Sequence, residues 1–438
     1  MSTPIPPNNA AFTLGQVAES TGGQLLKGDR RKRLSGVCTD TRKLRAGNLF
    51  VALRGENHDG HRFLAQAVER GAGALLVQTE AALPGGAAAV AVADTLGALG
   101  DLAAAFRQRF SYPLVAITGS MGKTSSKELI SAALSACGMR VLASRGNLNN
   151  LVGLPMSLFL LDDGLNAAVL ELGTSAHGEI ARLSEITRPQ VGVVTEVAAA
   201  HTEQLGSIEQ VAREKGSLLR SLGPAAAAVY NADTPYLAGS LQDLSAGQVL
   251  TYGRSAGAAV RLLDCELLAR PATRCAYQIT SSGLRLQTEL ALLGQGAALN
   301  AAAALAVVLA LGREPELEAA LRAVSRVAPV PGRMSPQPGP GGSLLLDDTY
   351  NCNPGSAIAS LGSAVALARA RGGRAIAVLG DMAELGELSR FEHERVGREA
   401  VRLGVAALVA CGPRMSDAAE AARQQAQADR SDGGVTVL

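Results

Sequence analysis

The chain has 438 residues, of which 47% are hydrophobic and 18% are charged. These values are typical of a globular protein with two or three domains, and no apolar run reaches the roughly 20 residues that a membrane span needs. The 41 basic and 39 acidic residues give a net charge of +2 and form no basic stripe, which argues against nucleic acid as a partner.

The N-terminal sequence MSTPIPPNNA has neither the basic segment nor the apolar core of a secretory signal, so we expect a cytoplasmic protein. The six cysteines form no C-x-x-C pair. This spacing argues for reduced thiols and against a zinc site or a disulfide framework.

The first unit, residues 1–110, mixes short strands and helices. The apolar runs NLFVAL (Asn48–Leu53) and ALLV (Ala74–Val77) predict strands. The segment Asp94–Phe110 predicts a helix that leads into the next unit.

The second unit, residues 111–326, alternates apolar strand candidates with helical segments. Such alternation favours an α/β fold with a mainly parallel sheet covered by helices. The alanine-rich runs at 297–306 and 357–370 predict helices. The strands are predicted at 114–118, 167–172, 190–195 and 225–230.

The third unit, residues 327–438, opens with PVPGRMSPQPGPGG (Pro329–Gly342), which is too rich in proline and glycine for regular structure. We interpret this segment as a hinge or connector. Strands predicted at 343–348, 374–379 and 406–410 make the rest of this unit α/β.

The most informative stretch is LVAITGSMGKTSSKELI (Leu114–Ile130), an apolar strand, a glycine turn and a helix that begins with lysine and threonine. It contains T-G-x-x-G-K-T, a short form of the P-loop. Glycine permits backbone angles that turn amides inward, and the helix N-terminus attracts anions. Lys123 is predicted to reach the β/γ-phosphates and Thr124 to bind Mg²⁺. An ordinary strand-to-helix turn would not explain the lysine–threonine pair. The predicted phosphate-binding residues are Gly119, Ser120, Gly122, Lys123, Thr124 and Ser125.

Three further side chains are candidates for chemistry, each with a plainer interpretation. Glu171 ends the strand AAVLE, where a second Mg²⁺-holding carboxylate is expected, although it could be a surface glutamate. His201 follows the next strand and could reach the same edge, but a single histidine is more often structural. Lys215, taken alone, would be a solvated lysine on a helix surface.

Eight motifs in a fixed order resemble the ATP-dependent Mur ligases of peptidoglycan precursor synthesis, from about residue 13 almost to the end. The resemblance implies a UDP-substrate-binding domain (1–110), a central ATP-binding P-loop domain (111–326) and a Rossmann-like C-terminal domain (327–438). The motifs are TGSMGKTSSKE, NLNNLVGLP, ELGTSAHGEI, AAAHTEQLGS, AREKG, PGRM, LLLDDTYNCNPGS and VLGDMAELGE.

Within the family, the chain is most similar to members that join D-alanyl-D-alanine to UDP-N-acetylmuramoyl-tripeptide. The resemblance implies that ATP converts the peptide carboxylate to an acyl phosphate, which the dipeptide amine attacks. It also implies two Mg²⁺ ions, and a carbamate on Lys215 derived from CO₂ that turns this lysine into a metal ligand. Together with Lys123, the ions would neutralise the γ-phosphate. The implied metal ligands are Thr124, Glu171, His201 and Lys215 as its carbamate.

The resemblance assigns roles to further polar residues. Arg333 would reach the nucleotide phosphates, Asp348 the ribose, and Asn300 the ATP site; without the family match, Arg333 and Asp348 would be interpreted as linker and turn residues. Asp381 and Glu384 would help to place the incoming dipeptide. Contacts with the uridine diphosphate and the rest of the substrate fall on Thr39, Asp40, Thr41, Arg42, Asn147, Asn149, Asn150, Thr174 and Ser175.

Two departures from the family pattern carry expectations of their own. The family has G-x-H-N-x-x-N where this chain has GQGAALN, so Gly296 and Ala297 replace a His-Asn pair and adenine recognition is expected to differ. The family continues past GVTVL into a Lys-Gly-Ser-Arg motif, so the last domain is expected to lack a sheet edge and part of the dipeptide site.

Three other functions stay open beside this one. They are an amino-acid-adding Mur ligase, a folylpolyglutamate synthase, and a nucleotide-binding scaffold without turnover. In each case we expect a monomer.

Overall fold

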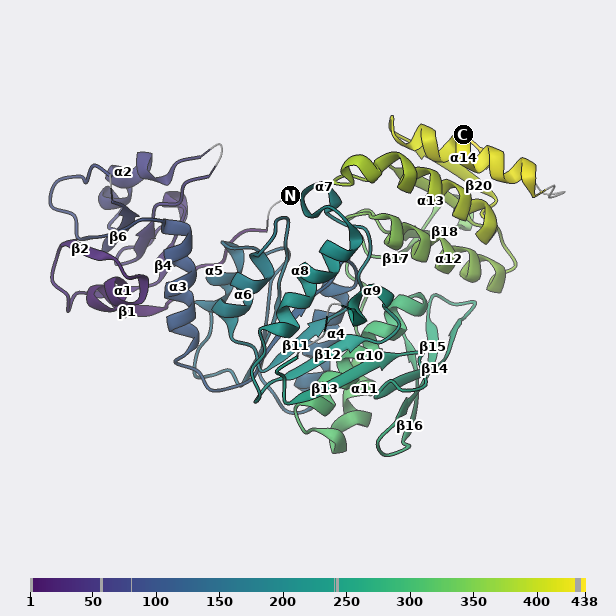
Figure 1. Ribbon diagram of the computed structural model, residues 1–438, viewed down its shortest axis with the longest axis horizontal. Helices are drawn as coiled ribbons and strands as arrows, with labels where there is room; N and C mark the ends of the chain where they lie inside the picture. Colours follow the sequence, from purple (N-terminus) through teal and green to yellow (C-terminus); the bar gives the residue numbers. More distant parts are fainter. Residues whose placement is uncertain (1–2, 56–57, 80, 240, 242–243, 430–434) are drawn as a thin grey trace. The chain divides into compact units, whose positions relative to one another are not determined.

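The structure, a computed structural model, describes residues 3–55, 58–79, 81–239, 241, 244–429 and 435–438. The chain divides into two compact units. Figure 1 labels helices and strands of both. The first contains the chain up to Ala116 together with residues 140–173 and 181–189. The second contains residues 117–139, 174–180 and 190–438.

The first unit contains a five-stranded sheet in the order β2-β7-β6-β5-β4 and a separate antiparallel pair, β1 with β3. The predicted strands NLFVAL and ALLV are confirmed as β5 and β6, which pair in parallel. The strands are β1 (Ala11–Thr13), β2 (Gln24–Lys27), β3 (Arg33–Ser35), β4 (Val37–Cys38), β5 (Leu49–Val51), β6 (Ala74–Gln78) and β7 (Ala89–Val92).

Helices α1 and α3 of this unit start at side-chain caps. The helix expected at 94–110 is confirmed as α3 (Thr95–Arg107), where the Asp94 carboxylate accepts hydrogen bonds from the amides of Leu96 and Gly97. The others are α1 (Leu14–Thr21), η1 (Thr41–Lys43), η2 (Gly60–Phe63), α2 (Leu64–Glu69) and α5 (Gly153–Leu158).

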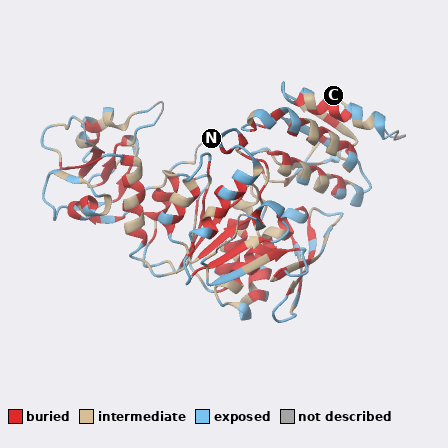
Figure 2. Cartoon of the chain, viewed as in Figure 1, coloured by how far each residue is buried: buried red, intermediate tan, exposed pale blue. Residues whose placement is uncertain are grey.

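The largest sheet has the strand order β16-β15-β14-β13-β12-β11-β8-β10-β9. Its strands confirm the four predicted at 114–118, 167–172, 190–195 and 225–230, and the mainly parallel α/β fold class is confirmed with them. Strands β8, β10 and β11 are buried along their whole length, which explains their apolar sequences (Figure 2). This part of the sheet consists of β8 (Leu114–Thr118), β9 (Val141–Ala143), β10 (Ala167–Glu171), β11 (Val191–Val194) and β12 (Ala227–Asn231).

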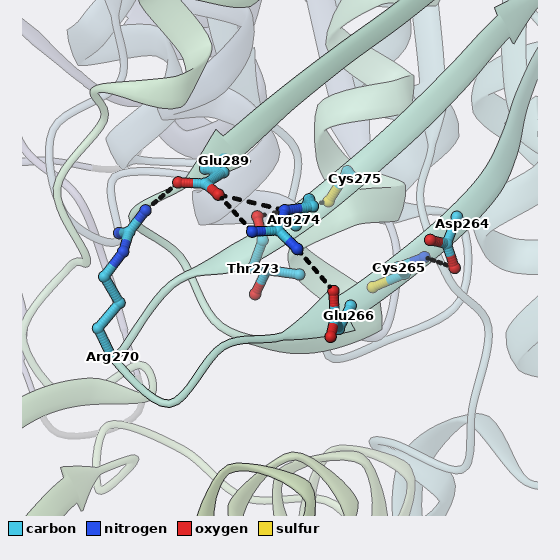
Figure 3. A network of polar contacts seen from close by, with 8 residues as sticks. All are labelled: Asp264, Cys265, Glu266, Arg270, Thr273, Arg274, Cys275 and Glu289. Carbon is cyan, nitrogen blue, oxygen red and sulfur yellow. Dashed lines mark hydrogen bonds and ion pairs between the residues drawn. The ribbon is translucent and has the colours of Figure 1, made fainter. Parts of the chain in front are cut away.

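The sheet ends in an antiparallel extension that was not predicted from the sequence. Strand β13 (Gln248–Gly253) is parallel to β12, whereas β14 (Val260–Leu267), β15 (Thr273–Ile279) and β16 (Arg285–Leu290) pair antiparallel. On its solvated face Arg274 bonds to Glu266 and Glu289 (Figure 3). All three side chains are at least one-third exposed, so these pairs stabilise the extension little.

The helices of the second unit include both predicted alanine-rich helices, α10 and α12. Helix α10 is buried on most sides, which an alanine- and valine-rich sequence permits. Besides η4 below, the helices in the described part of this unit are α4 (Lys123–Ala136), α6 (Glu179–Thr187, shared with the first unit), α7 (Thr202–Leu205), α8 (Ile208–Arg220), α9 (Pro235–Ala238), α10 (Gly294–Ala310), η3 (Glu314–Glu316), α11 (Leu317–Ser325), α12 (Pro354–Ala370), η5 (Gly386–Leu388), α13 (Ser389–Leu403) and α14 (Met415–Ala428).

The prediction that Pro329–Gly342 is irregular is wrong in part. Strand β17 (Ser335–Pro338) pairs antiparallel with β18 (Leu344–Asp347), and η4 (Pro340–Gly342) joins them. A two-stranded ribbon tolerates two prolines because each strand has an open edge where no amide is needed. The parallel sheet that follows is β19 (Ile376–Gly380), β20 (Ala407–Cys411) and β21 (Thr436–Val437).

Within the described ranges, no helix combines the length and the apolar composition needed to cross a membrane.

Candidate functional site

The predicted phosphate loop lies between buried strand β8 and helix α4. Gly119 has φ 150°, and a β-carbon there would lie 2.0 Å from the Thr195 hydroxyl, so a larger residue does not fit. Gly122 forms the N-cap of α4 with φ 82°, a left-handed conformation that favours glycine. The motif therefore has glycine where the backbone demands it.

The segment after β11 fixes the shape of this loop. The Ser120 amide donates to the Glu196 carbonyl at 2.6 Å, and the Ser120 hydroxyl donates to the Ala198 carbonyl at 2.9 Å. The Thr195 hydroxyl donates to the Met121 carbonyl at 2.5 Å. The loop is thus preorganised by main-chain and hydroxyl contacts.

Lys123 is the first residue of α4 and is half-buried. Its ammonium donates to the Gly119 carbonyl at 2.6 Å, so the side chain folds back over the loop. Thr124, the next residue, is 9% exposed. Both side chains therefore lie at the helix N-terminus, where an anion is favoured.

The sequence context of Lys215 alone suggested a solvated lysine on the helix surface. In the structure this side chain is buried instead. It is 1% exposed on the inner face of α8. Burial, together with the positive charge of Lys123, lowers the pKa of Lys215 to about 7. The amine is consequently neutral far more often than an ordinary lysine, and a neutral amine is the form that reacts as a nucleophile.

Glu214, which was not predicted from the sequence, anchors the segment that carries Thr174 and Ser175. Its carboxylate is 7% exposed and accepts hydrogen bonds from the amides of Gly178 and Ile180, each at 2.8 Å. Within that segment the Thr174 hydroxyl donates to the Ala176 carbonyl at 2.7 Å. Helix α8 thus fixes residues 178–180 of the ELGTSAHGEI motif and carries Lys215 at the adjacent position.

Replacement of Glu214 by alanine is expected to lower the free energy of unfolding by about 1–3 kcal/mol, because two amides lose a buried acceptor. Thermal unfolding followed by circular dichroism measures this change. Arg213→Ala on the exposed face of the same helix is the control and should change the stability by less than about 0.5 kcal/mol. Equal stability of the two variants would contradict the anchoring role.

His201 and Glu384 are in direct contact although 183 positions separate them. The imidazole Nδ1 of His201 meets the Glu384 carboxylate, and the histidine side chain is 28% exposed. Burial and the charge of Lys215 lower the pKa of His201, against the opposing effect of Glu384. The titrations of His201 and Lys215 both respond to Lys123, so these groups share one electrostatic neighbourhood.

Asn300 lies against the phosphate loop. The Ser126 hydroxyl donates to its side-chain oxygen at 3.1 Å, and that oxygen would be 2.6 Å from a β-carbon at Gly122. Gly296 and Ala297 stand where the family pattern has a His-Asn pair. Ala297 is buried. Gly296 has open space beside it, because no atom would lie within 4 Å of a β-carbon there.

The start of α12 meets the loop from the last part of the chain. The Asn353 side-chain amide donates to the Ser120 carbonyl at 3.4 Å, and a β-carbon at Gly355 would lie 3.3 Å from the Met121 sulfur. Asn353 is also the N-cap of α12. This residue was not predicted from the sequence, although the Asn-Pro-Gly-Ser run is a helix-start signal.

Arg333 and Asp348, which were predicted to bind the nucleotide, contact other residues of the last part of the chain. The Arg333 guanidinium stacks over the Tyr350 ring at 4.3 Å. Asp348 accepts hydrogen bonds from the Met334 amide at 3.1 Å and the Ser360 hydroxyl at 2.5 Å. Asp381, by contrast, accepts from the amides of Arg414 and Met415 at the start of α14.

In the first unit, Glu171 is the last residue of β10 and is 2% exposed. Its amide donates to the Ser144 hydroxyl at 2.7 Å. The Asn149 carbonyl accepts from the Gly173 amide at 2.8 Å, which holds the asparagine loop beside the end of β10. The Asn150 side-chain oxygen accepts from the Gly153 amide at 2.8 Å, and the Asn147 side-chain oxygen accepts from the Thr3 amide.

The predicted uridine-diphosphate segment forms a short turn. Asp40 caps η1 by accepting from the Arg42 amide, and it pairs with the Arg42 guanidinium at 2.8 Å. This pairing lowers the pKa of Asp40. The Thr41 hydroxyl donates to Gln66 at 2.6 Å, while Thr39 is half-buried.

Comparison with known families accounts for most of the chain. Residues 33–107 match the Mur ligase family catalytic domain, 117–308 the Mur ligase middle domain, and 332–436 the Mur ligase glutamate ligase domain. The UDP-N-acetylmuramoyl-tripeptide–D-alanyl-D-alanine ligase of Escherichia coli is 38% identical, over 92% of this chain and 86% of its own length. The chain belongs to the Mur ligase family.

Other Mur ligases agree in sequence and fold. The Bacillus subtilis ligase of the same name is 33% identical, over 88% of this chain and 82% of its own. MurF from Acinetobacter baumannii has a TM-score of 0.85 at 30% identity, covering 100% of this chain and 96% of that one. MurF from Thermotoga maritima in complex with ADP has a TM-score of 0.78 at 27% identity, over 92% of both chains.

Proposed function

We propose that this Mur ligase uses ATP to join D-alanyl-D-alanine to UDP-N-acetylmuramoyl-tripeptide, releasing ADP and phosphate. The observation that carries this proposal is a buried Lys215 amine in the electrostatic neighbourhood of a preorganised P-loop lysine. A scaffold that only bound nucleotide would have no use for this costly buried amine. The Escherichia coli and Bacillus subtilis ligases, which match almost the whole chain, support the choice of substrates.

The reaction follows from what the loop can hold. Lys123 and the loop amides would bind the γ-phosphate and offset its charge as the tripeptide carboxylate approaches. The carboxylate oxygen attacks the γ-phosphorus and ADP leaves, which gives an acyl phosphate. The dipeptide amine then attacks the acyl carbon and loses a proton, and phosphate departs as the amide forms.

Three of the four proposed donor groups would present oxygen, the ligand atom that Mg²⁺ favours, and the fourth would present an imidazole nitrogen. The residues proposed to hold two ions are the Thr124 hydroxyl, the Glu171 carboxylate, the His201 imidazole and Lys215 as its carbamate. Bound Mg²⁺ would neutralise phosphate charge. The carbamate forms when the neutral Lys215 amine attacks the carbon of CO₂ and releases one proton, so a neutral base becomes an anionic oxygen ligand.

The proposal also includes the domain bounds, the nucleotide-binding residues, the oligomeric state and the cellular compartment. Domain bounds of 1–110, 111–326 and 327–438 are supported by the three family matches. Asn300 against the loop and Arg333 beside Tyr350 support nucleotide roles. We also propose a monomer that works in the cytoplasm, where ATP is available.

Phosphate release that requires both UDP-N-acetylmuramoyl-tripeptide and D-alanyl-D-alanine tests the proposed function. Release with a single amino acid and the dipeptide precursor would instead identify an amino-acid-adding ligase. ATP binding without release under either condition would identify a scaffold and refute the proposal. A peptide-bond product detected by mass spectrometry completes the assay.

A further inference from the structure

The loop after β19 is fastened to helix α7 by three contacts within the second unit. Besides the His201–Glu384 pair, the Glu203 amide donates to the Glu384 carbonyl at 3.1 Å. The Thr202 hydroxyl donates to the Leu385 carbonyl at 3.1 Å, and this bond is buried. Residues 384–386 therefore dock on the first turn of α7. The backbone carbonyls of Glu384 and Leu385 are hydrogen-bonded to α7, and these bonds hold the Glu384 carboxylate next to His201.

Both partners of the central contact have unusual backbone conformations. Among the described residues, four other than glycine have positive φ, and they include His201 at 56° and Glu384 at 60°. Such conformations are unfavourable for a residue with a β-carbon and persist only where the surroundings hold them. That the two strained residues meet each other indicates a contact with a purpose beyond packing.

The chemistry of the pair determines which imidazole nitrogen is available. An ionised carboxylate can only accept a hydrogen bond, so Nδ1 of His201 carries the proton and its N–H group donates a hydrogen bond to Glu384. The other ring nitrogen, Nε2, is then left with its lone pair. A carboxylate that accepts from one ring nitrogen while the other binds a metal is the usual outer partner of a metal-binding histidine.

We propose that Glu384 is a positioning residue that sets the tautomer and ring orientation of His201 for a divalent cation. Docking of residues 384–386 on α7 then completes the cation site. The inference rests on the proposed function in one respect, that His201 is a cation ligand. It gives Glu384 a role toward the cation in place of the direct dipeptide contact that the sequence predicted.

Titration of the full-length protein with Mn²⁺, followed by the loss of the free-ion signal in electron paramagnetic resonance, tests this inference. Glu384→Ala is expected to weaken Mn²⁺ binding about 10–100-fold, the usual effect of losing an outer-shell partner. Glu384→Gln keeps an acceptor oxygen and should stay within about threefold of the unmodified protein. Glu387→Ala, an exposed glutamate three residues away, is the matched control and should bind normally.

His201→Ala separates the possible failures. If it binds Mn²⁺ as the unmodified protein does, His201 is no ligand and its proposed metal role fails together with the present inference. If His201→Ala weakens binding but Glu384→Ala does not, only the present inference is overturned. An increased KM for D-alanyl-D-alanine with unchanged Mn²⁺ affinity in Glu384→Ala would restore the dipeptide role. Thermal unfolding of each variant establishes that all are folded.

Discussion

Replacing Lys123 with alanine is expected to reduce ligation at least about 1,000-fold while the protein stays folded. The ammonium lies at the N-terminus of α4 and bonds to the loop carbonyl of Gly119, where it would meet the γ-phosphate. Removing a preorganised group that stabilises transition-state charge costs about 100–1,000-fold even for a neutral donor. A full positive charge opposite phosphate should cost more.

The measurement is phosphate release with both substrates present, alongside the melting temperature. Folding should survive because Lys123 is only half-buried and its side chain is not part of the apolar core. Ser135→Ala, at the exposed far end of α4, controls for changes to the helix and should leave turnover unaltered. Turnover of Lys123→Ala within tenfold of the unmodified protein would refute the phosphate role.

The parallel core of the fold could be predicted from sequence because its strands are buried on both faces. A continuous apolar run such as residues 114–118 or 225–230 indicates a buried strand when it is short and a helical segment follows it. In the antiparallel strands β14 to β16, residues that face the core alternate with residues that face solvent. These strands therefore contain no continuous apolar run, and they were not predicted from the sequence. The two-stranded ribbon at 335–347 was only partly predicted, because prolines in its first strand indicated an irregular segment.

The candidate site divides in the same way between local and long-range information. The phosphate loop is local, since its glycines, lysine and threonine lie within seven residues and its two glycines each have a backbone reason. The burial of Lys215 and the contact between His201 and Glu384 depend on tertiary packing across long separations. Only the family resemblance pointed to Lys215, because a single helix lysine carries no signal of its own.

Replacing Lys215 with alanine is expected to abolish ligation, and a short carboxylic acid such as acetate is expected to restore part of it. The side chain lies in a fully buried position, so truncation leaves a space on the inner face of α8. In the carbamate proposal the missing group is a carboxylate-like anion attached to that chain. Acetate supplies the same two oxygens, whereas methylamine would restore only the amine.

Two comparisons make this experiment decisive. Acetate should not rescue Lys123→Ala, since the group lost there is a cation, and methylamine should not rescue Lys215→Ala. Independently of turnover, ¹³C-labelled bicarbonate should give a carbamate carbonyl signal in the unmodified protein that Lys215→Ala lacks. The amine can react because burial and Lys123 lower its pKa to about 7, which leaves much of it neutral near neutral pH. Rescue by methylamine, or the same carbamate signal in both proteins, would show that Lys215 acts as an amine and would remove the anionic ligand from the proposed cation site.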